Sequence, residues 1–94
     1  STSMALGPAD RARARLAALG GDREGAAMLL DAAESLAVRV GSALWEGWCV
    51  LEAVRLGTAP ARDRPHLLDR AAALAATSGS VRLARAVERA SKGA

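Results

Sequence analysis

The sequence predicts an all-α protein, and three observations support this fold class. First, 51% of the 94 residues are hydrophobic, yet the chain has no Phe and no Tyr, so its apolar content is mostly Ala, Leu and Val. Ala and Leu favour helices, whereas strands favour β-branched and aromatic residues. Second, glycines divide the chain at helix-length intervals. Third, one phrase of fourteen residues occurs twice. We expect a five-helix right-handed array of antiparallel helix pairs, about two and a half repeats long.

Glycines and the polar residues after them predict the helix boundaries. Glycine adopts the left-handed conformation that ends many helices, and Asp or Ser commonly caps the next one. The sequence has three such junctions, at Gly21-Asp22, Gly41-Ser42 and Gly79-Ser80, and Gly57 ends a further segment. The predicted helices are about Pro8–Leu19, Arg23–Val40, Ala43–Leu56, Arg64–Ser78 and Val81–Ser91.

Prolines refine two of these boundaries. Pro8 suits the first turn of a helix, where its missing N–H costs nothing. Pro65 would disrupt a helix interior, so the fourth helix is expected to start near Asp63 as its N-cap, after a loop over Thr58–Arg62.

Apolar spacing predicts which faces are buried. The second helix carries Leu29, Ala33, Leu36 and Val40 at steps of four, three and four. Such spacing forms one seam on a helix. The third helix is apolar nearly all the way round, which predicts that it lies at the centre. The expected core contains Leu29, Ala33, Leu36, Trp48, Leu51, Val54, Leu67, Ala71 and Leu74.

The repeated phrase predicts a structural repeat. Residues 29–42 read LLDAAESLAVRVGS and residues 67–80 read LLDRAAALAATSGS, with eight identities in fourteen positions at an offset of 38. Such a period is typical of helix–turn–helix arrays. The alternative is two unrelated Ala-rich helices with similar caps.

Composition also limits the class of protein. The net charge is only +3, and one Cys cannot form an internal disulfide. No apolar run approaches the roughly 18 residues of a membrane span. We therefore expect a cytoplasmic location without membrane contact. The opening STSMALG, residues 1–7, is expected to be a tag remnant, which leaves residues 8–94 as a single helical-repeat domain cut from a larger protein.

No motif in the chain predicts catalysis, a cofactor or a metal. His66 is the only His and is expected to be a solvated first-turn residue, while Cys49 is expected to be packed and inert. One His and one Cys cannot make the usual four-ligand zinc site. The segment GGDREG, residues 20–25, has the glycine spacing of a phosphate loop, but Ala26 stands where that loop needs Lys. The protein is expected not to be an enzyme.

Two sets of residues remain as candidate contacts. Arginines step along the first and fifth helices, at Arg11, Arg15, Arg82, Arg85 and Arg89. The chain lacks Asn and Gln and has one Lys, so direct nucleic-acid contact is not expected, and these arginines form either a solvated face or a surface for an acidic partner. Trp45 and Trp48 share a helix face, as core residues or as the lining of a small-ligand pocket.

Residues 16–57 contain the pattern L…GD…A..LL..A..LA..VG, followed by an aromatic-rich helix that ends in glycine. This segment resembles the degenerate tetratricopeptide repeats of large LuxR-type (MalT-like) and AfsR-like bacterial transcriptional regulators, over about residues 9–91. The standard signature is incomplete, because Tyr is absent and no Pro follows Ser78.

The resemblance implies a protein-interaction or signal-relay module in which the first helix of each pair lines the concave face. It makes contact candidates of Arg11, Arg15, Glu46, Arg82 and Arg85. An array cut from a longer chain also exposes its ends, which predicts a weak homodimer through Leu83 and Val87. The alternative function is a small-ligand sensor with a pocket near Trp45 and Trp48.

Overall fold

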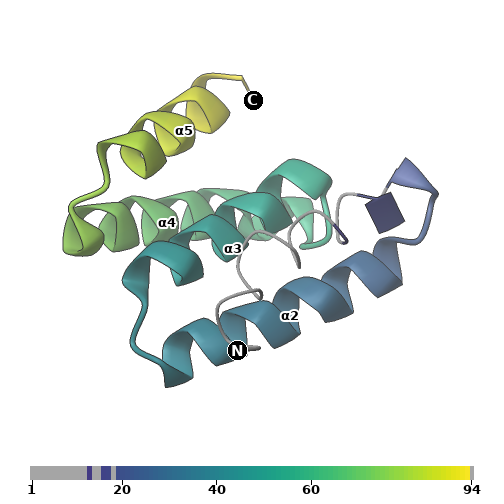
Figure 1. The fold of residues 1–94 in the computed structure, drawn as a ribbon. Helices are drawn as coiled ribbons and strands as arrows, with labels where there is room; N and C mark the ends of the chain where they lie inside the picture. Colours follow the sequence, from purple (N-terminus) through teal and green to yellow (C-terminus); the bar gives the residue numbers. More distant parts are fainter. Residues whose placement is uncertain (1–12, 14–15, 18, 94) are drawn as a thin grey trace.

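The computed structural model describes residues 13, 16–17 and 19–93, and everything described in it is helix, turn or loop. Figure 1 shows the main helices, which are α2 (Arg23–Arg39), α3 (Ala43–Leu56), α4 (Arg64–Ser78) and α5 (Val81–Lys92). A short 3₁₀ helix, η1 (Ala61–Asp63), precedes α4. The all-α prediction is confirmed, and the four α-helix boundaries lie within one residue of their expected positions. The first expected helix falls mainly outside the described residues, although Arg13, Leu16, Ala17 and Leu19 are helical.

Side-chain caps begin three of the helices as the sequence predicts. Asp22 Oδ1 accepts a hydrogen bond from Gly25 N at 2.8 Å. Ser42 Oγ and Ser80 Oγ accept equivalent bonds from Trp45 N at 3.2 Å and Leu83 N at 3.1 Å. Each cap satisfies a backbone N–H that has no partner within its own helix, so each fixes where the chain turns into the next helix.

The start of α4 differs from the other three. Asp63 stands at the N-cap position, but its side chain makes no capping hydrogen bond, and its backbone is itself helical. The preceding turn η1 leads the chain into α4, with Asp63 N bonded to the carbonyl of Pro60 at 2.9 Å. Pro65 occupies the first turn of α4, where it removes no helical hydrogen bond. The expected boundary is therefore correct, while the expected side-chain cap is wrong.

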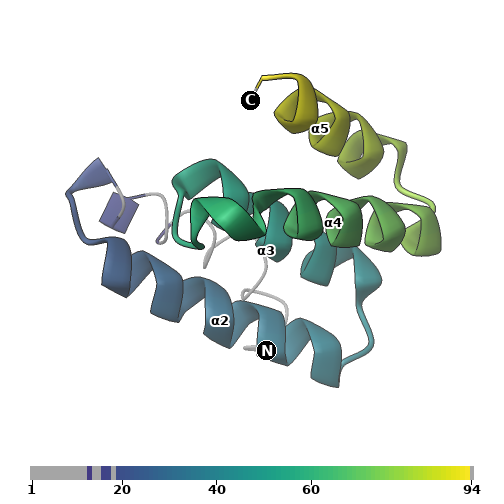
Figure 2. The same ribbon diagram turned by 180° about the vertical axis from the view of Figure 1, so that it is seen from behind.

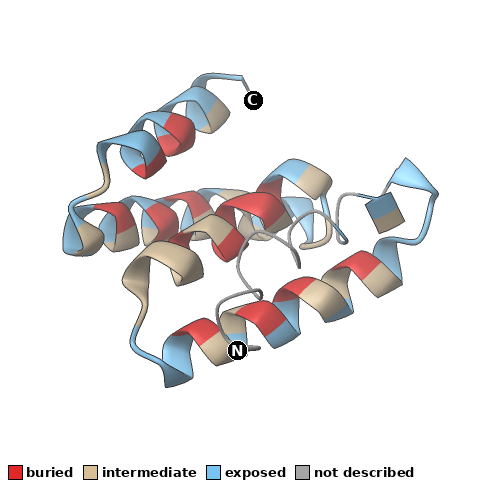
Figure 3. Ribbon diagram, viewed as in Figure 1, coloured by how far each residue is buried: buried red, intermediate tan, exposed pale blue. Residues whose placement is uncertain are grey.

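Helix α3 is the centre of the protein, as its apolar circumference predicts. It packs against α2, α4 and α5, whereas α2 does not pack directly on α4 or α5. In both ribbon views α2 and α5 lie on opposite sides of α3 and α4 (Figures 1 and 2). Buried positions accordingly recur on α3 from Gly47 to Val54 (Figure 3).

The buried seams of α2 and α4 lie one residue away from the predicted ones. The expected core residues Ala33, Leu51, Val54 and Ala71 are buried. The others, namely Leu29, Leu36, Trp48, Leu67 and Leu74, are only half-buried, and Val40 is exposed. The buried seam of α2 is Ala26, Leu30, Ala33 and Ala37, and that of α4 is Leu68, Ala71 and Ala75. These seams are rich in alanine, and small side chains let α3 approach both helices closely.

The corrected seams still follow the repeated phrase. Three pairs of positions 38 residues apart are buried together, and they are Leu30/Leu68, Ala33/Ala71 and Ala37/Ala75. Gly41 and Gly79 both adopt left-handed backbone, with φ of 74° and 72°. The serines that follow them cap the next helices in the same way. The two copies of the phrase therefore occupy similar local environments.

Candidate interaction surface

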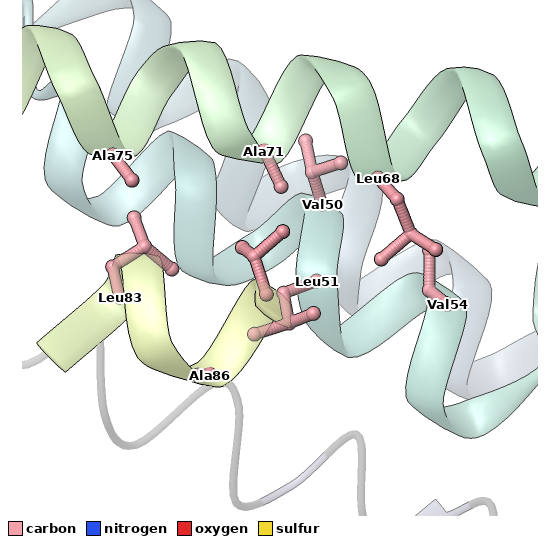
Figure 4. Packing of buried hydrophobic residues seen from close by; sticks show 9 residues of the cluster. Val50, Leu51, Val54, Leu68, Ala71, Ala75, Leu83 and Ala86 are labelled. Atoms are coloured by element: carbon pink, nitrogen blue, oxygen red, sulfur yellow. The ribbon is translucent and has the colours of Figure 1, made fainter. Parts of the chain in front are cut away.

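Helix α5 has one apolar and one charged side. Its apolar residues Leu83, Ala86 and Val87 join the main core with residues of α3 and α4. Figure 4 shows Leu83 of α5 directed toward Ala75 of α4, with Leu51 of α3 beside them in this core. Gly47 on α3 makes the close approach possible, because a Cβ at that position would lie 2.5 Å from Leu83 Cδ2.

This packing overturns one expectation from the sequence. Leu83 is 0% exposed and Val87 is 5% exposed, so neither forms the open apolar end that was predicted for self-association. Helix α4 does not cover them alone, since α3 contributes to the same core. A dimer through Leu83 and Val87 would require α5 to leave its place, because the exposed large apolar side chain of α5 is Val81 and not either of these two residues.

The opposite side of α5 carries three exposed arginines, Arg82, Arg85 and Arg89, which we call the arginine face. Their spacing places them within about one-sixth of a helical turn of one another. None of the three forms an ion pair or a side-chain hydrogen bond with another described residue. The neighbouring Glu88 is exposed and pairs with Lys92 at 3.2 Å. Among the described residues, the positive charge of the arginine face therefore has no acidic partner.

Glu46, the acidic contact candidate, has an intramolecular role. Its Oε2 lies 2.7 Å from Arg70 Nη2, and the same nitrogen lies 2.6 Å from Glu34 Oε2. Arg70 on α4 therefore links Glu34 on α2 with Glu46 on α3, although α2 and α4 do not pack together. Glu46 is largely buried by this arrangement, so the structure does not present it as a free contact residue.

Arg70, Glu34 and Glu46 together form a clamp that holds three helices. The hydrogen bond to Glu46 raises the pKa of Arg70 above its usual value, partial burial lowers that pKa, and the hydrogen bond to Glu34 raises it further. The guanidinium of Arg70 therefore stays charged, and the clamp is a structural element.

The two tryptophans lie partly in the interior. Trp48 packs against the main core cluster, which agrees with the core interpretation. Trp45 is also half-buried and begins α3, with its N–H held by Ser42. The small-ligand pocket expected near them stays a prediction.

Other candidate groups for chemistry are packed, exposed or outside the described residues. Cys49 is buried, as expected, and His66 is exposed. Glu52 is 0% exposed and pairs with Arg55 at 3.2 Å. The described part of the chain contains no cluster of His, Cys, Asp or Glu that could hold a metal ion. Arg11 and Arg15 lie outside the described residues, as does the expected tag segment at residues 1–7.

A cleft of about 530 Å³ lies where α2 begins, α3 ends and α4 begins. Two arginines line it, Arg23 and Arg64, together with Thr58 and an apolar wall of Val54, Ala59, Pro60, Ala61 and Leu67. Sequence patterns did not identify this cleft, because its two arginines are 41 positions apart and belong to no periodic stripe. The only available signal was that both arginines stand at predicted helix starts.

The described residues form an all-α fold. One side of its last helix, α5, carries three arginines that have no acidic partner among these residues. None of the helices in the described ranges combines the length and apolar character that crossing a bilayer requires. No protein-family model, curated protein or solved structure matches the chain.

Proposed function

We propose that this protein is a helical-repeat interaction module, a tetratricopeptide-like array that serves signal relay within a larger cytoplasmic bacterial transcriptional regulator. The resemblance of residues 9–91 to LuxR-type and AfsR-like regulators motivates the family. Support for the repeat comes from the burial and capping shared by the two copies of the fourteen-residue phrase. The packing of each helix on its neighbours in the chain also suits a layered array.

The arginine face is the observation that carries the proposed binding role. Three guanidinium groups without acidic partners lie on one side of a helix whose other side is fixed in the core. Guanidinium pairs strongly with carboxylates, and surface charge of one sign speeds the encounter with the opposite sign. An acidic protein segment, from the same full-length chain or from another protein, is therefore the partner that fits.

Titration of a fluorescein-labelled Glu-rich peptide, followed by anisotropy, tests this role. We expect saturable binding that weakens as salt rises, and at least about a tenfold weaker Kd when Arg82→Glu and Arg85→Glu are combined. The matched control is Arg39→Glu with Arg62→Glu. It changes the net charge equally at two exposed arginines outside α5.

Two outcomes would contradict the proposal. Equal loss of binding in both double variants would show that only net charge matters. Tighter binding of a labelled DNA duplex than of the peptide, lost with the α5 variant, would assign the arginine face to nucleic acid instead. The sequence of the adjoining parts of the full-length gene product tests the family, since an ATPase module and a DNA-binding domain are expected there.

A small-ligand sensor is the second candidate function. Its support is the half-buried pair Trp45 and Trp48 on the central helix. Titration of a metabolite panel against tryptophan fluorescence separates the two functions, because a sensor predicts a saturable change without any acidic peptide.

A further inference from the structure

We infer that the cleft between α2, α3 and α4 binds a small organic anion, a phosphate or carboxylate that carries a short apolar group. The inference goes beyond the proposed interaction role and rests on other residues. Both ribbon views place the start of α2, the end of α3 and the start of α4 at the same end of the molecule (Figures 1 and 2). The cleft they form, about 530 Å³, is within the size range of small-molecule sites.

Charge is the first argument. Arg23 and Arg64 line the cleft, and none of its described lining residues is acidic. Neither arginine forms an ion pair with a described residue, although Asp22 and Asp63 precede them directly in sequence. Asp22 is instead engaged in capping α2. Within the described part of the chain, the cleft therefore has two positive charges and no counterion.

The second argument is an unsatisfied donor on Arg64. Its Nη2 donates to the carbonyl oxygen of Ala90 on α5 at 3.0 Å, which anchors one end of the guanidinium. Its Nε is buried and has no hydrogen-bond partner. Buried hydrogen-bond donors of charged groups are rarely unpaired in native proteins, so this unpaired donor indicates that an acceptor is missing. A phosphate or carboxylate in the cleft supplies the counter-charge, and its oxygen becomes an acceptor for Nε when the guanidinium turns toward the cleft.

The third argument is the mixed chemistry of the wall. Val54, Pro60 and Leu67 offer an apolar surface beside the two arginines. Ligand sites commonly combine such a wall with a few placed polar groups. A ligand with an apolar part therefore gains more from this cleft than a bare ion does.

A competing explanation is that Arg64 interacts with the carboxylate of Asp69 rather than with a ligand in the cleft. Arg64 also borders a smaller hollow of about 320 Å³, which is lined by Pro65, Leu68, Asp69 and Ser91. Asp69 is exposed and forms no ion pair with Arg64 in the structure. The variant Asp69→Asn distinguishes the two possibilities, because it leaves the cleft intact.

The test is titration of the ¹⁵N-labelled protein with four probes, followed by backbone amide shifts. Phenyl phosphate and benzoate carry charge and an apolar ring, inorganic phosphate carries charge alone, and benzyl alcohol carries the ring alone. We expect saturable shifts at Thr58, Ala59 and Ala61, with a Kd on the order of 1 mM for the better aromatic anion. Inorganic phosphate should bind more weakly, and benzyl alcohol should not saturate. The stronger of phenyl phosphate and benzoate assigns the anionic group.

Variants decide whether the cleft is responsible. Arg23→Gln and Arg64→Gln should each weaken binding about tenfold or more. The control Arg62→Gln removes an exposed arginine of η1 that does not line the cleft, and it should change the Kd less than about twofold. If Arg64→Gln fails to fold because it loses the bond to Ala90, Arg23→Gln still carries the test.

Three results would overturn the inference. They are no saturation with any anion, equal weakening in Arg62→Gln, or shifts that saturate only at residues remote from the cleft. Tighter binding in Asp69→Asn with unchanged binding in Arg23→Gln would assign the anion to the smaller hollow, because the Asp69 carboxylate repels an anion there. Because the acidic-peptide experiment uses α5 variants, either proposal can fail while the other stands.

Discussion

Adding one methyl group at Gly47 tests how closely α5 packs on α3. In an exposed helix, replacing Gly by Ala stabilises by about 1 kcal/mol, because Gly loses more backbone freedom on folding. At Gly47 the new Cβ would lie 2.5 Å from Leu83 Cδ2 and 3.2 Å from Leu74 Cβ. Leu83 is fully buried, so its methyl group has no empty space to enter.

The overpacking effect should be larger than the helix-propensity gain. Extra methyl groups in a packed core cost about 1–3 kcal/mol. We therefore expect Gly47→Ala to lower the free energy of unfolding by up to about 2 kcal/mol, the difference between these two effects. Urea unfolding, followed by tryptophan fluorescence and by far-ultraviolet circular dichroism, measures the change. An unchanged slope with urea would show that only stability has altered.

Removing the Leu83 side chain should reverse the sign of the stability change that Gly47→Ala causes. Leu83→Ala alone should cost about 2–5 kcal/mol, and in that background Gly47→Ala should stabilise by about 0.5–1 kcal/mol. The exposed substitution Ala72→Gly on α4 calibrates the propensity effect. If Gly47→Ala stabilises the wild-type protein, or if its effect is the same in both backgrounds, α5 does not pack on α3 as described.

Three further predictions concern the clamp, the seam and a cap. Arg70→Gln should lower the free energy of unfolding by about 1 kcal/mol, because it removes two charged hydrogen bonds. The loss is no larger because the Arg70 side chain is 39% exposed to solvent. High salt should reduce the stability difference between the wild-type protein and this variant. Leu30→Ala should cost about 2–4 kcal/mol and clearly more than Leu29→Ala; equal losses in urea unfolding would contradict the revised seam of α2. Ser80→Ala should cost about 1 kcal/mol in thermal unfolding, and Ser80→Asp should restore most of it.

The helix boundaries could be predicted from the sequence because they depend on local groups. Asp22, Ser42 and Ser80 each cap a backbone N–H three residues ahead, and Gly57 and Gly79 adopt the left-handed conformation that L side chains avoid. Such features need no knowledge of distant residues. The same local signals cannot show that η1, rather than a capping side chain, leads into α4.

The predicted buried residues of α2 differ from the observed ones because two sets of residues on this helix have the same spacing. In α2 the steps of four, three and four describe Leu29–Val40 as well as Ala26–Ala37. Reasoning from size favoured the stripe with more large side chains, whereas close helix packing buries the one with more alanines. Which of the two applies depends on the distance between helices, and that distance is a tertiary property.

The candidate surfaces were predicted only in part, for the same reason. The arginine face follows from spacing on one helix, so Arg82 and Arg85 could be named in advance. The pairing of Glu46 with Arg70 joins residues 24 positions apart, and the cleft joins Arg23 with Arg64, 41 positions apart. The burial of Leu83 depends partly on Gly47, 36 positions earlier. No periodicity within one helix contains that information.

Helix α5 has an apolar side and a charged side, so the two sides differ in what can pack against them. A further helix laid on its outer side would have to desolvate Arg82, Arg85 and Arg89, and charge buried without partners is strongly unfavourable. Any helix that packs on this side of α5 would therefore have to supply carboxylates for the three arginines.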